Sequence, residues 1–210
     1  MFMNDIYTLD NLCYKNNDNL IINKVSCAIK YNKITNIKGA NGAGKTTLLK
    51  LIYGLYEPSS GYITRHFDIK KTRLSYLLQN SILLNRSIKD NLRHALYCQN
   101  IQKKEWNNII SNGAKEFGLE YLLQLDMKSL SGGEFQLLTL LRSVLNSPNI
   151  LFLDEPTNNL DIDNVKIIAN IIRYFHQKGG SILLVSHDKI LLDMIEYDQI
   201  SINSGVIAND

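Results

Sequence analysis

The sequence predicts an α/β fold in which a parallel β-sheet presents ligand-binding residues at the carboxyl ends of its strands. Two observations support this prediction. First, the segments 150–153 and 181–185 are continuously apolar, as in strands buried on both faces of a parallel sheet, and polar residues follow each one. Second, a strand-like segment, 33–38, leads through a glycine-rich loop into a helical segment, 47–52. Open sheets of this kind bind ligands at that edge.

The glycine-rich loop Gly39–Thr46 fits the pattern G-x-x-x-x-G-K-[ST], which is typical of loops that wrap the phosphates of a nucleotide. The glycines let backbone N–H groups close around the β-phosphate, and the helix that follows directs its positive dipole end at the anion. Lys45 supplies positive charge for the β- and γ-phosphates, and the hydroxyl of Thr46 is placed to bind Mg²⁺. A turn without a ligand is the alternative, but the flanking strand and helix favour a nucleoside triphosphate site.

Composition indicates an ordinary globular chain with room for a sizeable core. The chain has 210 residues, of which 45% are hydrophobic and 20% charged, with a net charge of +3. It has no Lys/Arg-rich run of the kind that marks a nucleic-acid surface, so no nucleic-acid partner is expected. There is no signal-peptide pattern at the start and no apolar run near the roughly 20 residues that span a bilayer. We therefore expect a cytoplasmic protein that works at a membrane through partners.

The first 38 residues are expected to form short strands, namely 6–9, 20–22, 25–29 and 34–37, with a turn at 16–19. Tyr14 lies upstream of the phosphate loop and is expected at the end of the first strand. An aromatic ring at this point can stack on an adenine base, as rings do in other nucleotide sites. A half-buried strand residue without a ligand is the alternative.

The middle of the chain is expected to be a helical insert. Strands at 62–64 and 74–78 come first, and Gln79 follows the second of them. From residue 81 to 128 apolar side chains recur at helical spacing and glycine is sparse; they are Ile88, Leu92, Leu96, Trp106, Ile109, Ile110, Ala114 and Phe117. Trp106 is assigned to packing, because a tryptophan at this spacing belongs to a core far more often than to a cofactor site.

The segment Leu130–Glu134 opens a new helix that runs through Leu145. Ser131 suits the N-cap position and Glu134 stands three residues later, which predicts a capping box. The two glycines between them, Gly132 and Gly133, have no function in a capping box. They leave bare backbone N–H groups at the start of a helix, which is a site for an anion. The two interpretations are compatible.

The strand 150–153 ends in two carboxylates, and the strand 181–185 ends in Ser186-His187-Asp188. Asp154 is expected to hold Mg²⁺ through its water shell, and Glu155 to accept a hydrogen bond from the attacking water. His187 stands at the edge of the same predicted crevice, where a role at the γ-phosphate is expected. Between these strands a polar loop, 157–161, precedes an amphipathic helix that Gly179 and Gly180 end. A final helix and a hairpin-like end complete the chain.

Together these segments resemble the ATP-binding subunit of ATP-binding-cassette (ABC) transporters over essentially the whole chain. The matching positions, in order, are Tyr14, Gly39–Thr47, Gln79, Leu130–Glu134, Ile150–Glu155, Asn158–Asp161 and His187. The resemblance implies a P-loop NTPase core of ABC-ATPase type with an antiparallel β subdomain and an inserted α-helical subdomain. It further implies that residues 1–210 form a single ABC ATPase domain, with approximately 81–145 as the helical subdomain that includes the signature helix.

The resemblance also assigns the site. It implies an ATPase that binds ATP and Mg²⁺, with Glu155, His187 and Lys45 as catalytic residues and Thr46, Gln79 and Asp154 around the metal. The nucleotide contacts it implies are Tyr14, Gly39, Asn41, Gly42, Gly44, Lys45, Thr46, Thr47, Gln79, Ser131, Gly132, Gly133 and Asp161. In a head-to-tail dimer, each ATP would touch Lys45 of one subunit and the Ser131–Gly133 segment of the other.

The implied partners are integral membrane permease subunits and an extracytoplasmic solute-binding protein, with the ATPase peripheral on the inner face of the membrane. A compact insert after residue 82 is similar to importers of small solutes, including tungstate and related oxyanions, so oxyanion import is the expected function. Export, or cytochrome c maturation, is the first alternative. A soluble ribosome-associated ABC ATPase is the second, because the loop 157–161 resembles that of such proteins.

Overall fold

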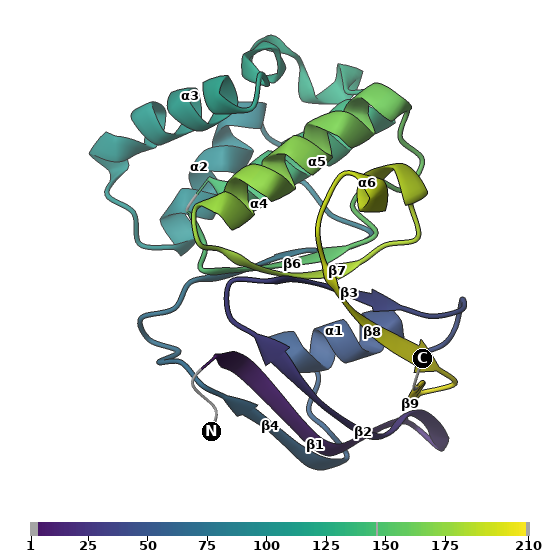
Figure 1. Cartoon of the computed structure of the whole chain (residues 1–210). Coiled ribbons are helices and arrows are strands. Elements are labelled where there is room, and N and C mark those ends of the chain that lie inside the picture. Colours follow the sequence, from purple (N-terminus) through teal and green to yellow (C-terminus); the bar gives the residue numbers. More distant parts are fainter. Residues whose placement is uncertain (1–3, 146, 209–210) are drawn as a thin grey trace.

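The computed structural model describes residues 4–145 and 147–208 (Figure 1). Its strands are β1 (Asp5–Asn16), β2 (Asn19–Lys30), β3 (Ile34–Lys38), β4 (Ser60–Arg65), β5 (Leu74–Leu77), β6 (Ile150–Asp154), β7 (Ser181–Val185), β8 (Asp198–Asn203) and β9 (Val206–Ile207). Its α-helices are α1 (Lys45–Tyr53), α2 (Ile88–Cys98), α3 (Trp106–Glu116), α4 (Gly132–Val144), α5 (Ile162–Gln177) and α6 (Lys189–Asp193). Short 3₁₀ turns lie at Lys103–Glu105, Glu120–Gln124 and Met127–Ser129.

These strands form two sheets. The larger has the order β5-β6-β7-β3-β8-β9, and all of its neighbouring pairs except β8–β9 are parallel. The smaller is antiparallel, with the order β2-β1-β4. The prediction of a parallel sheet is therefore confirmed, and the two continuous apolar runs of the sequence are its neighbouring interior strands β6 and β7.

The apolar run of β6 is continuous because both faces of the strand are covered. Leu151 and Leu153 pack into one hydrophobic cluster, whereas Ile150 and Phe152 pack into another on the opposite face. Side chains alternate across a strand with period two, so a strand between two cores needs apolar residues at every position.

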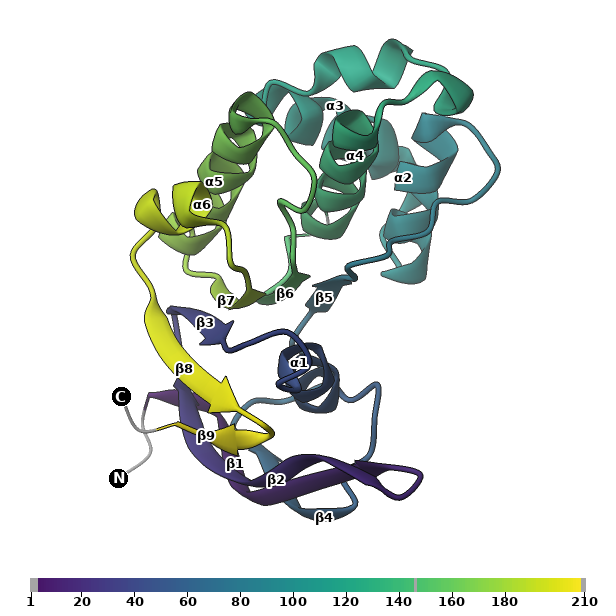
Figure 2. The ribbon, with the colours of Figure 1, turned by 90° about the vertical axis from the view of Figure 1, so that its right-hand side faces the viewer.

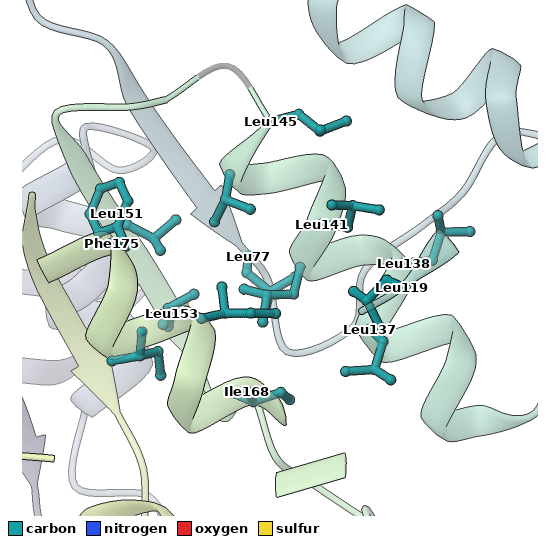
Figure 3. Packing of buried hydrophobic residues seen from close by; sticks show 14 of the residues in the cluster. Leu77, Leu119, Leu137, Leu138, Leu141, Leu145, Leu151, Leu153, Ile168 and Phe175 are labelled. Atoms are coloured by element: carbon teal, nitrogen blue, oxygen red, sulfur yellow. The ribbon is translucent and has the colours of Figure 1, made fainter. Parts of the chain in front are cut away.

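One cluster lies between the sheet and the helices α2 to α5. Leu137, Leu138 and Leu141 of the signature helix α4 are buried in it, as is Ile168 of α5, and Figure 3 shows these side chains beside Leu153 of β6. Trp106 packs against the same cluster and donates its ring N–H to the carbonyl oxygen of Ile101 at 3.0 Å. The packing role assigned to this tryptophan is therefore confirmed.

The second cluster lies on the other face, where α1 packs between the large sheet and the antiparallel sheet (Figure 2). Leu48, Leu49 and Ile52 of α1 are buried there together with apolar side chains of β1 and β2. The phosphate-loop helix α1 and the signature helix α4 thus cover opposite faces of the same sheet, as Figures 1 and 2 both show.

The amino-terminal strands differ from their prediction. Two long strands, β1 and β2, replace the expected series of short ones, and Tyr14 lies within β1 opposite Ile22 rather than at the end of a strand. Two residues that fall outside the expected short strands, Asn11 and Lys24, lie at bulges. Asn11 and Lys24 have positive φ angles of 45° and 49°, and the strand pairing shifts register near them. A bulge interrupts the apolar alternation without ending the strand.

Candidate nucleotide-binding site

The phosphate loop joins β3 to α1, and its glycines are required by the backbone. Gly44 stands at the N-cap position of α1 with φ 98°, a left-handed conformation that side chains disfavour, and no side chain caps the helix. At Gly39 the constraint is space, because a Cβ atom would lie 2.1 Å from the carbonyl oxygen of Ile202 in β8. The loop therefore presents backbone rather than side chains at the start of α1.

Lys45 is the first residue of α1 and is only 8% exposed. Its Nζ donates to the carbonyl oxygens of Gly39 and Ala40, both at 2.9 Å. An ammonium group has three N–H donors, so two are engaged in holding the side chain over its own loop. The third is available for an anion bound by the loop.

Asp154, at the carboxyl end of β6, is 1% exposed and is held on two sides. Its Oδ1 accepts a hydrogen bond from the Thr46 hydroxyl at 2.9 Å, and its Oδ2 accepts one from the Tyr76 hydroxyl at 3.4 Å. Burial raises the pKa of Asp154, and the hydrogen bond from Thr46 opposes that rise. Tyr76 was not singled out in the sequence; its only signal is its place on β5, one residue before Leu77, where the strand ends.

The oxygen atoms around Asp154 suit Mg²⁺. This ion prefers a few protein oxygens as ligands and completes its shell with water and phosphate oxygens. A carboxylate and a hydroxyl already lie together at Asp154 and Thr46. Gln79 is exposed just beyond the end of β5, and the pairing of Leu77 with Leu153 brings it to the same edge as Asp154. All three residues predicted around the metal thus come from one edge of the sheet.

Glu155 and His187 face each other across the tips of β6 and β7. The Oε1 atom of Glu155 lies 3.7 Å from the Nε2 atom of His187, with the side chains 20% and 41% exposed. Glu155 has a positive φ of 49°, and its N–H donates to the carbonyl oxygen of Val185 at 2.8 Å. Burial raises the pKa of Glu155, while the charges of His187 and Lys45 oppose the rise. Residues held in sparsely populated backbone conformations cluster at functional sites.

The loop before His187 has an anchor that sequence reasoning missed. Asn36 of β3 is fully buried and exchanges two hydrogen bonds with the backbone of Ser186. The signal in the sequence is an amide side chain in the middle of β3, a strand whose first four residues are all buried.

At the start of α4 the predicted capping box is confirmed. The Ser131 hydroxyl accepts from the N–H of Glu134 at 3.2 Å, and the Glu134 carboxylate accepts from the N–H of Ser131 at 2.8 Å. The hydrogen bond from the Ser131 backbone lowers the pKa of Glu134. Gln136, one turn further on, donates to the carbonyl oxygen of Pro156 at 2.9 Å. The signature helix is thereby tied to the loop that follows Glu155.

Asp161 has a local structural partner in this chain. Its carboxylate is the N-cap of α5 and accepts from the N–H of Asn164 at 2.8 Å. A Cβ atom on Gly133 would lie 2.6 Å from the side-chain amide of Asn164, so the starts of α4 and α5 are in close contact. The nucleotide contact predicted for Asp161 stays a prediction.

Tyr14 is half-buried and stacks on Tyr56, with ring centroids 5.3 Å apart and an angle of 2° between the planes. Lys50 of α1 lies 5.4 Å from the centre of the Tyr56 ring. Tyr14 pairs with Ile22, whose Cδ1 lies 2.9 Å from a Cβ built on Gly44, so one strand separates Tyr14 from the phosphate loop. One face of the ring is thus covered by another aromatic side chain, and adenine stacking on this ring stays a prediction.

The structure therefore brings most of the predicted residues to one edge. The ends of β3, β5, β6 and β7 and the start of α1 hold Gly39, Asn41, Gly42, Gly44, Lys45, Thr46, Thr47, Gln79, Asp154, Glu155 and His187. Ser131, Gly132 and Gly133 stand apart from them, at the start of a helix on the opposite face of the sheet from α1.

Comparison with known proteins agrees with this geometry. The sequence model of the ABC transporter family matches residues 22–158, and a model of an AAA domain matches residues 125–193. The zinc import ATP-binding protein ZnuC of Wigglesworthia glossinidia brevipalpis is 34% identical over 207 residues, which is 98% of this chain and 86% of that protein. The lipoprotein-releasing system ATP-binding protein LolD of Buchnera aphidicola is 32% identical over 201 residues, covering 88% of each.

Solved structures show the same fold. The structure of cbiO1 from Clostridium perfringens, part of the ABC transporter complex cbiONQ, superimposes with a TM-score of 0.84 at 23% identity. It covers 98% of this chain and 88% of the other. An ATP-binding subunit of an ABC transporter superimposes with a TM-score of 0.83 at 22% identity, covering 96% of this chain and 88% of the other.

The fold has a P-loop core, an antiparallel β subdomain and an inserted helical subdomain. The chain belongs to the ABC transporter family, as the motifs of the sequence indicated. It is an ATP-binding subunit that hydrolyses ATP with Mg²⁺, and subunits of this family dimerise and work with membrane permeases. Within residues 4–145 and 147–208, none of the helices combines the length and apolar character needed to cross a bilayer.

Proposed function

We propose that this ATPase drives the import of a divalent metal cation, with zinc as the solute, through a membrane permease. The observation that carries the proposal is the 34% identity to a zinc import ATP-binding protein over 98% of this chain and 86% of that protein. A second zinc import protein, ZnuC of Vibrio parahaemolyticus, is 33% identical over 89% of this chain. The relatives described here give the expected oxyanion solute no support, so zinc replaces it in the proposal.

The proposed reaction is in-line attack of water on the γ-phosphate of ATP. Backbone N–H groups of the phosphate loop and the start of α1 hold the phosphates, and Lys45 directs its remaining donor at them. Thr46, Gln79 and Asp154 hold Mg²⁺, which neutralises charge on the phosphates when it is bound. Tyr76 keeps the Asp154 carboxylate facing Thr46.

In this proposal Glu155 acts on the attacking water and His187 on the γ-phosphate. Glu155 accepts a hydrogen bond from the attacking water, and burial, which raises its pKa, makes the carboxylate a better base. His187 contacts the γ-phosphate from the tip of the neighbouring strand. Their 3.7 Å separation supports this assignment, because both side chains can then reach a terminal phosphate and the water that attacks it.

The dimer completes the site in the proposal. Ser131, Gly132 and Gly133 start a helix on the opposite face of the sheet from the phosphate loop, which favours a nucleotide contact in another copy. A head-to-tail arrangement lets each ATP touch Lys45 of one copy and the Ser131–Gly133 segment of the other, with Asp161 near the same contact. The bound anion then meets two helix starts rather than one.

Lipoprotein release is a second candidate, favoured by the 32% identity to LolD over 88% of both chains. The names of the relatives described here give the ribosome-associated class no support. ATP-binding protein Uup of Buchnera aphidicola is 34% identical, but the match covers only 30% of that protein, and its name favours no particular function. In the transport proposal residues 1–210 act as one ATPase domain on the inner face of the membrane, held there by the permease and served by an extracytoplasmic solute-binding protein.

The test is capture from detergent-solubilised native membranes with the Glu155→Gln variant and ATP, because this variant is expected to bind ATP without turning it over. We expect a membrane permease to come with it, and Lys45→Ala, the matched control, to capture much less. The permease and the wild-type ATPase are then placed in vesicles, and ATP-dependent uptake of radioactive zinc is compared with uptake of tungstate. Uptake of tungstate but not zinc would contradict the solute, and capture of ribosomal proteins without a permease would contradict transport.

A further inference from the structure

A buried amide joins the strand before the phosphate loop to the loop that holds His187. Asn36 is 0% exposed, and its Nδ2 donates to the carbonyl oxygen of Ser186 at 3.4 Å. Its Oδ1 accepts from the N–H of Ser186 at 3.1 Å, and Ser186 is itself 1% exposed. Strand β3 pairs with β7 as far as Asn36 and Leu184, so the side-chain amide continues the pairing after the two backbones diverge.

The amide is not explained by packing. Asn36 shares its face of β3 with Ile34, which belongs to the cluster beneath the helices, and an apolar side chain would suit that environment better. With such a side chain, however, the N–H and carbonyl of Ser186 would lose the partners described here while remaining buried. The hydrogen bonds to Ser186, rather than packing in the core, therefore explain why an asparagine stands at position 36.

His187 stands between two anchored neighbours. On one side is Ser186, held by Asn36, and on the other is Asp188, whose N–H donates to the Ser186 hydroxyl at 3.2 Å. The Asp188 carboxylate caps α6 by accepting from the N–H of Ile190 at 2.9 Å. The imidazole is the exposed member of this rigid turn, and it lies 3.7 Å from Glu155.

We propose that Asn36 is a positioning residue for His187. By fixing Ser186 to the strand that leads into the phosphate loop, Asn36 holds the imidazole at a set distance from the γ-phosphate that the loop binds. The proposal rests on the function proposed above for His187. It concerns turnover rather than affinity, because Asn36 contacts none of the residues Gly39–Thr46 in the hydrogen bonds described. Small displacements of a positioned group slow catalysis strongly.

The first test is the Asn36→Leu substitution in the full chain, which keeps the branching and the number of side-chain heavy atoms and removes both hydrogen bonds. We expect kcat for ATP to fall by about tenfold to a hundredfold. The Kd for a Mg²⁺ complex of an ATP analogue with an imido bridge between its β- and γ-phosphates should stay within about twofold, because the phosphate loop is unchanged. Asn36→Ala is made alongside, in case the leucine prevents folding.

Ser181→Ala is the matched control. Ser181 is also fully buried and joins β7 to the turn before β3, since its hydroxyl accepts from the N–H of Asn32 at 2.8 Å, but it lies at the other edge of the sheet. We expect this substitution to lower Tm and to leave kcat and the Kd for the analogue unchanged. A loss of kcat equal to that of Asn36→Leu would reduce the role of Asn36 to general stability and overturn the proposal.

The second test follows the histidine ring directly. The chain has 4 histidines, so their ring signals in an NMR spectrum are few, and His187→Ala identifies one of them. In the wild type the His187 signal should move when the imido analogue and Mg²⁺ are added, and in Asn36→Leu this movement should be lost. A wild-type response in both Asn36 variants would overturn the proposal. If His187→Ala itself keeps the wild-type kcat, the proposed role of His187 has failed, which is a separate result.

Discussion

The two helix starts that the sequence linked to anions are built differently. Helix α1 begins after Gly44 with no side-chain cap, and its first residue is a buried lysine. Helix α4 begins after Ser131 with a complete capping box, and Ser131 and Gly132 are exposed. The box engages the N–H of Glu134 and not those of the two glycines. The helices cover opposite faces of the sheet.

This difference between the starts of α1 and α4 indicates how each of them can bind an anion. At α1 one chain supplies the phosphate loop, Lys45 and the residues proposed to hold Mg²⁺. A single copy is therefore expected to bind the phosphates at this helix without a partner. At α4 the cap stabilises the helix without a ligand, and the N–H groups of the two glycines take no part in the capping box. Such a helix is stable in a single copy and is suited to a ligand that another copy presents. The predictions below test this contrast, from the largest effect to the smallest.

Removing the charge at α1 should abolish nucleotide binding. For Lys45→Ala we expect ATP affinity to fall at least about a hundredfold, because a charge-assisted contact in a partly buried site is lost. Equilibrium binding of ATP with Mg²⁺ measures the effect. Lys115→Ala, an exposed lysine on α3, is the charge-matched control and should bind as the wild type does. Equal affinity for Lys45→Ala would show that α1 is not the primary site.

Neutralising Glu155 should separate binding from turnover. We expect Glu155→Gln to lower kcat by roughly 10²- to 10⁴-fold, the range of a general base, while ATP binding persists. Size-exclusion chromatography with ATP should show a stable dimer, since the nucleotide that joins the two helix starts is no longer consumed. A kcat near the wild-type value would show that another group polarises the water.

Truncating Tyr14 should weaken binding less. If an adenine stacks on this ring, Tyr14→Ala costs about 1–3 kcal/mol of binding free energy, and Tyr14→Phe costs little. Comparing ATP with inorganic triphosphate sharpens the test, because only ATP carries a base. Equal losses for both ligands would mean that Tyr14 acts only through its packing on Tyr56.

The smallest effect is expected at the cap of α4. Ser131→Ala should lower the free energy of unfolding by about 1 kcal/mol, the usual value for a lost N-cap, and leave the ATP affinity of a single copy unchanged. Chemical denaturation measures the first quantity and binding at low protein concentration the second. Weaker ATP binding by the single copy would contradict the separation of the two helix starts.

Much of the site could be predicted from the sequence because its signals are local. The spacing of Gly39, Gly44 and Lys45, the capping box at Ser131 and the carboxylates after an apolar strand each lie within a few residues. Parallel strand topology then brings the strand ends together. Predicting these elements did not require knowing which distant segments of the chain lie together.

The contacts that sequence reasoning missed all join segments distant in the chain. Asn36 and Ser186, which form hydrogen bonds, are 150 positions apart in the chain, and Tyr76 and Asp154 are 78 apart. Tyr14 of β1 stacks on Tyr56, which follows α1. Such pairs depend on strand order and register, which local patterns do not specify. The long strands β1 and β2 were missed for a related reason, because their bulges look like turns in the sequence.

The central claim is that Lys45 and Ser131 serve one ATP from two different copies. The most direct test mixes two inactive variants, Lys45→Ala and Ser131→Arg, and measures ATP hydrolysis. In mixed dimers one of the two sites takes Lys45 from one copy and Ser131 from the other, so activity should return to about a quarter of the wild-type rate with random pairing. If both residues served the nucleotide of their own chain, every site would lack one of them. No recovery of activity in verified mixed dimers would contradict the account.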